Sequence, residues 1–398
     1  MAMARPKKEP LPTNPRVLRW ARENAGISPE NAAKHLKIPR SKLSDWETPD
    51  NEVRPTVRQA RKLADFYGRP FLELFLADPP ALPEPKLLPD FRLYARVEGP
   101  EENKALKNIQ IWAEAQRSNA LDLYEELSDI PTRIDPKLFV TIDAEPEVAA
   151  AAAREAISFP IEDQVGRSQN ERSLVPQMIR DRIESLGILA LRVSNLKQYG
   201  VRGFCMVDDP LPIIIFGKES PNAQAFTLGH ELAHVFIRQS AISGFIPREG
   251  GDERKRKVEE WCDAFAGAFL MPSTAVVQRV EGVPLPNKTI SDENLLELAE
   301  YFAVSRHAMC IRLMHLELVS SRFYWEVKKP QFDEEERRYR SFGRAKYYGR
   351  RFIGSLGKLY TSLVIDALNS GRITNHHAAE FMGTTFTHLR DIRENFGR

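Results

Sequence analysis

Residues 223–238 have the sequence AQAFTLGHELAHVFIR, and the rest of the chain is interpreted outward from this segment. Apolar residues recur in it at helical spacing, so we predict a helix from Ala223 to Arg238. His230 and His234 are four residues apart and therefore lie on one helix face, about one turn from each other. Two imidazoles in this arrangement can reach a single zinc ion at roughly 2.0–2.1 Å. Glu231 completes an H-E-x-x-H motif, in which the carboxylate serves as a general base beside the metal.

A catalytic zinc ion needs a third protein ligand and keeps one position open for water. The segment VEEWCDAFA (258–266) follows within a few dozen residues, inside a helix predicted from Lys257 to Leu270. We prefer Glu259 as the ligand, because Asp263 four residues later shares its face and can accept the second ring N–H of a ligand histidine. The side chain of Glu260 points about 100° away.

The spacing of hydrophobic residues along the chain changes near residue 187. GILALRVS (187–194) and GFCMVDDPLPIIIFG (203–217) predict three short strands, the last two joined at Asp208-Asp209-Pro210. Helical spacing covers most of the remainder, at 101–128, Glu147–Ile157, Leu174–Leu186, Glu293–Val319, Tyr347–Asn369 and Ile373–Asn395. The predicted fold class is mostly α with a small β-sheet (α+β). We predict a helical connecting region over 91–184, a domain over 185–320, and a basic helical C-terminal domain over 328–398.

The first 76 residues predict a compact group of five short helices. Ser28 caps the second of these, Pro29–Leu36, and a third begins near Arg40 after a tight turn. The proline-rich segment ADPPALPEPKLLPD (77–90) can neither continue a helix nor donate regularly to a sheet, so we predict a linker there.

Composition is that of a globular protein, with 42% hydrophobic and 28% charged residues. No apolar run approaches the ~20 residues that cross a bilayer, and MAMARPKKEPLP lacks the apolar stretch of a secretory signal. We therefore expect a cytoplasmic protein without a membrane partner. Cys205, Cys262 and Cys310 are odd in number and far apart, which indicates buried thiols rather than disulfides or a CxxC metal site.

The net charge of +2 is unevenly distributed. Residues 1–76 carry 15 Lys/Arg and 9 Asp/Glu, and residues 328–398 carry 14 and 8, so each end has a net charge of +6 and the middle has −10. Basic ends around an acidic centre favour termini that approach nucleic acid. A solvated basic face, as in 337–351, is the alternative.

FTLGHELAH (226–234), the E-x-x-x-D element of VEEWCDAFA and FLMP (269–272) resemble the ImmA/IrrE metallo-endopeptidases, as does LAEYFAVSRHAMCIRLMHLELV (298–319). The resemblance covers roughly 185–320. It implies a gluzincin-like zinc site with His230, His234 and Glu259 as ligands and Glu231 as the general base, and it implies that the protein cut is a DNA-bound repressor. Cys262-Asp263 stands where the family more often has Ala-Asn. No oxyanion-stabilising residue emerges, and His307 and the tyrosines stay open.

GISPENAAKHLKIPRSKLSDWE (26–47) resembles the Xre/Cro-type helix-turn-helix. The small pair Ala32-Ala33 lets two helices cross closely, and Leu43 and Trp46 are predicted core residues. The resemblance places four side chains where they reach bases or phosphates of double-stranded DNA, namely Arg40, Ser41, Lys42 and Ser44. Pro29 stands where such domains often place a DNA-contacting Gln, and a role in protein contacts or dimerisation is the alternative.

The C-terminal segment has a similar small helix-turn-helix pattern, in Gly371-Arg372-Ile373-Thr374 followed by AAEFMGTTFTHLRDI. Whether it binds DNA stays open at this point. Its adjacent His376-His377 pair is expected at the surface rather than in a metal site.

The leading hypothesis is a zinc-dependent endopeptidase that is coupled to a DNA-binding domain and cleaves a transcriptional repressor or related regulator. One alternative is a transcriptional regulator whose peptidase-like domain senses a ligand or partner without cleavage, and another is a toxin-antitoxin or phage-defence module. The presence of Glu231 beside the ligands favours catalysis, because a sensor needs no general base. A homodimer is left open.

Overall fold

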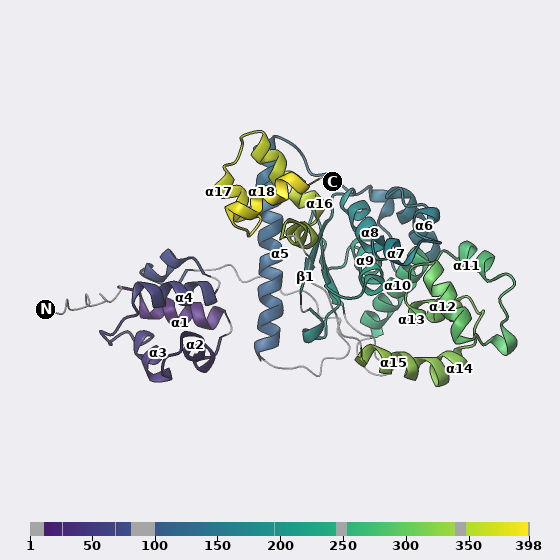
Figure 1. The fold of residues 1–398 in the computed structure, drawn as a ribbon, viewed down its shortest axis with the longest axis horizontal. Coiled ribbons are helices and arrows are strands. Elements are labelled where there is room, and N and C mark those ends of the chain that lie inside the picture. The colour runs from purple at the N-terminus through teal and green to yellow at the C-terminus, as the bar shows by residue number, and fades with distance from the viewer. Residues whose placement is uncertain are drawn as a thin grey trace. The chain divides into compact units, whose positions relative to one another are not determined.

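The computed structural model describes residues 12–25, 27–67, 69–80, 100–194, 196–243, 253–338 and 348–396 (Figure 1). Gly26, most of the predicted linker 77–90 and most of the basic segment 337–351 lie outside these residues. The chain forms two compact units, one of residues 1–87 with 97–112 and one of residues 88–96 with 113–398. Helix α5 (Pro100–Leu127) contributes to both. Among the described residues, no helix is long and apolar enough to span a bilayer.

The N-terminal unit confirms the five predicted helices. They are α1 (Pro15–Asn24), α2 (Pro29–Leu36), α3 (Arg40–Trp46), α4 (Val57–Tyr67) and the 3-10 helix η1 (Phe71–Phe75). The Ser28 hydroxyl accepts a hydrogen bond from the Asn31 backbone N–H, which caps α2 as expected. Small side chains of α2 pack with large ones of α3 in a core that includes Leu18, Ala32, Ala33, Leu43, Trp46 and Leu63.

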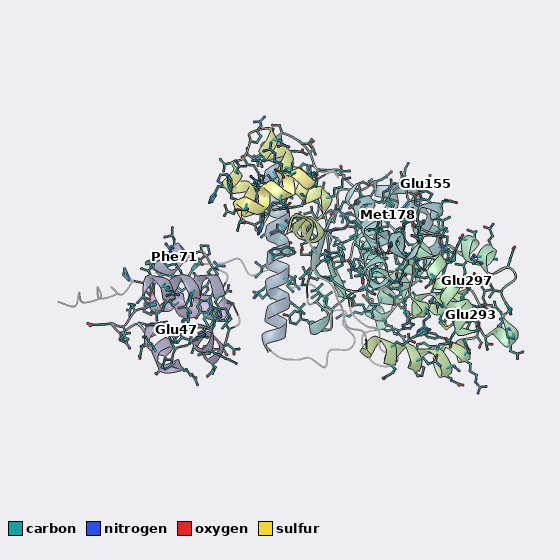
Figure 2. All side chains as sticks on the ribbon, in the orientation of Figure 1. Glu47, Phe71, Glu155, Met178, Glu293 and Glu297 are labelled. Atoms are coloured by element: carbon teal, nitrogen blue, oxygen red, sulfur yellow. The ribbon has the colours of Figure 1, made fainter. Side chains whose placement is uncertain are left out.

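A buried ion pair joins the end of α1 to the end of α3. Arg22 Nε donates to Glu47 Oε1 and Arg22 Nη2 donates to Glu47 Oε2, both at 2.8 Å. Figure 2 labels Glu47 in this unit. Because both charges are buried and the pairing is bidentate, the contact fixes one helix against the other in a single orientation.

The second unit is built on a four-stranded sheet in the order β1-β3-β2-β4. Strand β1 (Leu189–Val193) runs parallel to β3 (Ile213–Gly217), while β2 (Gly203–Met206) is antiparallel to β3 and to β4 (Ala241–Ser243). Helix α9 (Pro221–Phe236) packs on β2 and β3, and α16 (Tyr348–Asn369) packs on β1. Figure 1 shows the sheet between these two helices. Covering on both sides explains why every residue of β2 and β3 is buried.

Further helices complete this unit. They are α6 (Pro146–Ala156), α7 (Gln169–Arg172), α8 (Val175–Glu184), α10 (Glu253–Leu270), α11 (Ser273–Val280), α12 (Asp292–Tyr301), α13 (Arg306–His315), α14 (Ser321–Phe323), α15 (Lys329–Arg338), α17 (Asn375–Phe381) and α18 (Phe386–Asn395). Short 3-10 turns lie at Pro136–Leu138, Ile161–Asp163, Leu196–Tyr199 and Pro286–Lys288, and a π-helical turn lies at Tyr324–Lys328. The predicted fold class, mostly α with one small sheet, is confirmed.

The structure adds elements that the sequence patterns did not indicate, and it refines others. Strand β4 and helices α11, α14 and α15 were not expected. The helical stretch predicted over Glu293–Val319 is two helices, because Ala303 adopts a positive φ of 53° between them. The three cysteines are free and buried, as expected.

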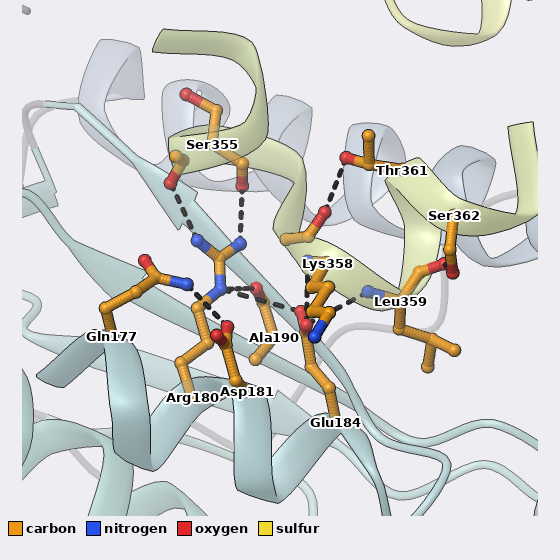
Figure 3. A network of polar contacts seen from close by, with 12 residues as sticks. Gln177, Arg180, Asp181, Glu184, Ala190, Ser355, Lys358, Leu359, Thr361 and Ser362 are labelled. Atoms are coloured by element: carbon orange, nitrogen blue, oxygen red, sulfur yellow. Dashed lines mark hydrogen bonds and ion pairs between the residues drawn. The ribbon is translucent and has the colours of Figure 1, made fainter. Parts of the chain in front are cut away.

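A buried ion pair holds α16 against α8 and β1 (Figure 3). Helix α16 is broken at Gly357, which has φ 85° and ψ 172°. Before the break, Arg180 Nη1 and Nη2 donate to the carbonyls of Gly354 and Ser355 at 2.8 and 3.0 Å. After it, Glu184 Oε2 accepts from the Lys358 and Leu359 amides at 2.7 and 3.0 Å. The cation thus caps a helix C-terminus and the anion caps a helix N-terminus, the arrangement that the helix dipole favours.

We expect Arg180→Ala to lower the free energy of unfolding of this unit by about 3–5 kcal/mol, because it leaves the buried Glu184 carboxylate without its countercharge. Chemical denaturation, followed by circular dichroism, measures the loss. Arg182→Ala on the same helix is the control, since Arg182 is half-exposed and lies 3.7 Å from Asp163, a pair worth about 0–1 kcal/mol. Equal effects of the two substitutions would contradict a special role for the buried pair.

Candidate metal centre

The centre is built where α9 and α10 cross. A Cβ atom added to Gly229 would lie 3.5 Å from both Cα and Cβ of Ala266, so two small residues face each other at the crossing. Helix α9 begins at Pro221 behind the Ser220 cap and carries a buried apolar face that includes Leu228, Leu232 and Val235. The two helices therefore approach closely just beside the histidine pair of the H-E-x-x-H motif.

The crossing brings together His230 and His234 of α9 and Glu259 of α10. His230 Nε2 lies 3.3 Å from Glu259 Oε2, and His234 Nε2 lies 3.1 Å from Glu259 Oε1. One ligand atom from each of the three residues can be chosen so that all lie within 4.8 Å of one another. All three side chains are buried, His230 being the most accessible at 6%.

These three side chains are better placed to bind a metal ion than to form hydrogen bonds with one another. Both Glu259 oxygens and His230 Nε2 are buried yet make no hydrogen bond, although they face each other at short distance. Around a tetrahedral zinc ion with ligands at ~2.0–2.1 Å, neighbouring ligand atoms are roughly 3.3 Å apart, close to the separations seen here. Buried polar atoms rarely remain unsatisfied, so a cation between these three groups is the arrangement that their geometry suits.

Asp263 occupies the position expected for a residue that supports a ligand histidine. Its Oδ1 lies 2.8 Å from His230 Nδ1, on the opposite side of the ring from Glu259. A carboxylate there keeps the proton on Nδ1 and leaves Nε2 free to bind a metal. Glu260, the alternative acid, is exposed and lies 3.8 Å from Arg256.

The two histidines differ in their titration. Burial alone would lower the pKa of His230, but the Glu259 carboxylate and the hydrogen bond to Asp263 raise it well above the ordinary value. Burial lowers the pKa of His234. Burial would raise the pKa of Glu259, but the neighbouring His230 and His234 lower it to about 2. At neutral pH the metal-free centre therefore holds an ionised Glu259, a neutral His234 and a protonated His230.

Two cysteines lie near the centre, and neither belongs to the group of His230, His234 and Glu259. Burial raises the pKa of the Cys205 thiol well above its usual range, and the Glu231 carboxylate raises it further. Burial likewise raises the pKa of Cys262, and the charge of Glu259 adds to the effect. In the metal-free chain these surroundings favour the protonated form of both thiols.

Glu231 is fully buried and lies over β2 at Gly203, a residue without a side chain. A Cβ atom at Gly203 would lie 2.7 Å from Glu231 Oε1, 2.7 Å from Thr227 Cγ2 and 2.9 Å from the backbone carbonyl oxygen of Ile215. Only glycine, which has no Cβ atom, leaves room for these three neighbouring atoms. Sequence reasoning missed Gly203, because the contact depends on how α9 packs on the sheet.

Three further polar side chains hold the C-terminal end of α10, and sequence reasoning also missed them. Arg154 Nη1 donates to the Phe269 carbonyl at 2.7 Å, and Gln164 Nε2 donates to the Leu270 carbonyl at 2.7 Å. Arg312 Nε donates to the next carbonyl, that of Met271, at 2.8 Å. Carbonyls at a helix end have no partner within the helix, so these donors fix the position of α10 and thereby of Glu259.

The remaining candidates lie elsewhere. His307 Nε2 is 2.9 Å from the Tyr324 hydroxyl, and its ring stacks on Phe332. In the N-terminal unit, the outward side of α3 exposes all four predicted DNA-contacting side chains, which are Arg40, Ser41, Lys42 and Ser44. Arg40 also pairs with the exposed Glu30 at 2.6 Å.

Fold and centre together define a metallopeptidase-type domain that follows a helix-turn-helix domain. Residues 183–314 match the family model of the IrrE N-terminal-like domain, which is a metallopeptidase family, and residues 16–74 match a model described as a helix-turn-helix domain. These matches agree with the resemblances identified in the sequence. No curated protein matches the chain.

We expect Gly203→Ala to destabilise the protein by about 1–3 kcal/mol and to displace the Glu231 carboxylate, because the backbone of β3 cannot move away from the added methyl group. Thermal unfolding measures the first effect. Gly217→Ala is the matched control, since a Cβ there has its nearest neighbour at an ordinary 3.4 Å. If Gly203→Ala were as stable as Gly217→Ala, the close packing of Glu231 on β2 would be refuted.

Proposed function

We propose that this chain is a zinc-dependent endopeptidase that cleaves a transcriptional repressor or related DNA-bound regulator. The observation that carries the proposal is the buried group of His230, His234 and Glu259 with Glu231 beside it. Two neutral imidazoles and one carboxylate are a ligand set typical of catalytic zinc, with a fourth position left for water. The match to a metallopeptidase family supports the same class of reaction.

In the proposed mechanism His230, His234 and Glu259 would hold zinc, and the ion would supply a Lewis acid that polarises the scissile carbonyl and lowers the pKa of water toward ~7. The Asp263 carboxylate accepts a hydrogen bond from the Nδ1–H group of His230 and so orients the ring with Nε2 toward the centre. Glu231 accepts the proton of the attacking water and later transfers it to the leaving amine. The glycine at 203 gives the Glu231 carboxylate its place over β2.

The N-terminal unit is proposed to direct this activity to DNA. The exposed Arg40, Ser41, Lys42 and Ser44 on α3 support binding in a major groove, and the +6 charge of residues 1–76 supports phosphate contacts. A substrate that itself binds DNA would then be brought close to the peptidase. The hypothesis of a sensor that cleaves nothing requires the same fold but no proton transfer. Substitution of Glu231 therefore distinguishes a sensor from a peptidase.

We expect Glu231→Gln to keep zinc and the fold while peptide cleavage falls about 10²–10⁴-fold, because the amide cannot accept the proton from water. Cleavage is measured on a fluorescence-quenched peptide library, and zinc by elemental analysis. The same variant, expressed in cells and purified with its bound proteins, should retain the uncut substrate for mass spectrometry.

Glu260→Gln removes the neighbouring exposed acid of α10 and is expected to cleave like the wild type. His230→Ala with His234→Ala should lose zinc. If Glu231→Gln processed its protein partner and regulated its target genes like the wild type, the chain would be a sensor with a peptidase-like body.

Zinc binding at pH 7 should release about one proton per ion. In the metal-free chain His230 carries a proton because its pKa is raised, whereas His234 is already neutral and Glu259 already ionised. The proton must leave before Nε2 can bind the metal, so the apparent affinity rises with pH up to the pKa of His230 and then levels off. Calorimetric titration in two buffers of different ionisation enthalpy measures the number of protons released per zinc ion.

Asp263→Asn supplies the comparison. It removes one of the groups that raise the pKa of His230, so we expect fewer protons to be released and zinc affinity to fall about 10–100-fold. A wild-type protein that takes up zinc at pH 7 without releasing protons would contradict the proposed ionisation of the centre.

A further inference from the structure

The C-terminal helices α17 and α18 repeat the backbone of α2 and α3. Thr374 stands 346 residues after Ser28, and both hydroxyls cap a helix by accepting from the amide three residues later, each at 3.2 Å. Nine residues after each cap the chain turns through the left-handed region, with φ 56° at Lys37 and φ 59° at Gly383.

Hydrogen bonds of the two turns also correspond. The Ile38 amide donates to the Ala33 carbonyl at 3.0 Å, and the Thr384 amide, at the same spacing of 346 residues, donates to the Ala379 carbonyl at 2.8 Å. Backbone path and hydrogen-bond pattern therefore agree from the cap to the start of the second helix.

The buried side chains agree as well. The small pair Ala32-Ala33 corresponds to Ala378-Ala379, and both pairs are buried where the helices meet. Leu43 and Trp46, which anchor α3 in its core, correspond to Leu389 and Ile392, which are buried on the inner side of α18. The same helix-turn-helix is thus built twice, with different side chains on its outer surface.

The outer surface of α18 is open in the described chain. The positions of Arg40, Ser41, Lys42 and Ser44 are taken by Phe386, Thr387, His388 and Arg390, of which only His388 is half-buried. Phe386 is 65% exposed and the Arg390 side chain 81%. Arginine can donate two hydrogen bonds to guanine, and the methyl group of thymine accepts apolar contact from side chains such as phenylalanine or threonine.

The turn alone does not decide the function, because it also ends other helices of this chain, among them the first helix of the α12–α13 pair. Between α12 and α13, Ala303 has φ 53° and the Val304 amide donates to the Ala299 carbonyl at 2.9 Å. There the outward positions are half-buried or buried, among them Arg306, His307, Ala308 and Cys310. That pair is covered by its own domain, whereas α18 keeps its outer side accessible.

We infer that α17 and α18 form a second DNA-binding helix-turn-helix, with α18 as the recognition helix in a major groove of duplex DNA. Arg390 on the outer side of α18, together with the geometry shared with α2 and α3, which lie in the segment that matches a helix-turn-helix model, favours duplex DNA as the occupant. The inference goes beyond the proposed function, because cleavage and DNA binding by α3 do not require it. A chain with two such helices binds DNA through two separate sequence elements.

The test uses the full chain and a pool of duplexes with a randomised central region, from which bound sequences are selected and sequenced. Three variants are compared with the wild type. Arg40→Ala with Lys42→Ala alters α3, and Thr387→Ala with Arg390→Ala alters α18. Arg322→Ala is the matched control, because Arg322 is 84% exposed and pairs with an acid four residues later, just as Arg390 does.

The wild type is expected to select a two-part sequence. The α18 variant should lose one part and the α3 variant the other. On the selected duplex the α18 variant should raise Kd about 10–100-fold, while Arg322→Ala leaves Kd unchanged. Arg390→Lys keeps the charge but not the paired hydrogen bonds, so it should lose the base preference and retain binding to unselected DNA. Unchanged thermal unfolding and zinc content of the α18 variant establish that it is folded.

The inference is overturned if the α18 variant selects the same sequence with the same Kd as the wild type. It is equally overturned if the variant alters only the set of proteins that co-purify, since α18 would then be a protein-binding surface. A wild type that binds no duplex at low salt also overturns it. Peptide cleavage by the α18 variant is measured in parallel, so failure here is separate from failure of the proposed peptidase.

Discussion

The close contact of Gly229 with Ala266 sets the distance between α9 and α10, and the proposed chemistry depends on that distance. Two of the proposed ligands come from one helix and the third from the other, so no single element can form the candidate centre alone. A side chain larger than alanine at either position would separate Glu259 from the imidazoles, because ligand atoms around a small cation tolerate only a few tenths of an ångström. Gly203 has the same role on the other side of α9, where it makes room for Glu231.

Four of the charged side chains that are buried in this protein act on the ends of helices. Arg154 and Arg312 donate to carbonyls at the end of α10, while Arg180 and Glu184 cap the two halves of α16. A buried charge is costly unless its hydrogen-bonding groups are satisfied, and helix ends offer several unsatisfied groups of one sign. The same contacts therefore hold the helices in position and compensate the buried charges.

Those parts of the candidate metal centre that depend on helix periodicity could be predicted from the sequence. Spacing of four residues predicts that His230 and His234 share a face, and an angle of 100° per residue favours Glu259 over Glu260. The strands β1 to β3 were predicted because they are apolar runs between turns, whereas β4 has three residues and too little pattern to detect. Arg154 and Gln164 could not be predicted, because their carbonyl partners are more than a hundred residues away.

The helix pairs α2–α3, α12–α13 and α17–α18 separate what a backbone motif determines from what its surface determines. In each pair a residue with positive φ follows the first helix and the next amide donates back to it, a helix-ending turn that also occurs at Ser128, Ser158, Arg238, Glu317 and Gly371. The pair α12–α13 is covered, and at the position of Trp46 it carries Arg312, which holds the end of α10. The pairs near the two ends of the chain keep their second helix exposed. The same local geometry therefore supports the candidate metal centre where it is covered, and it leaves the side chains of the second helix accessible where it is open.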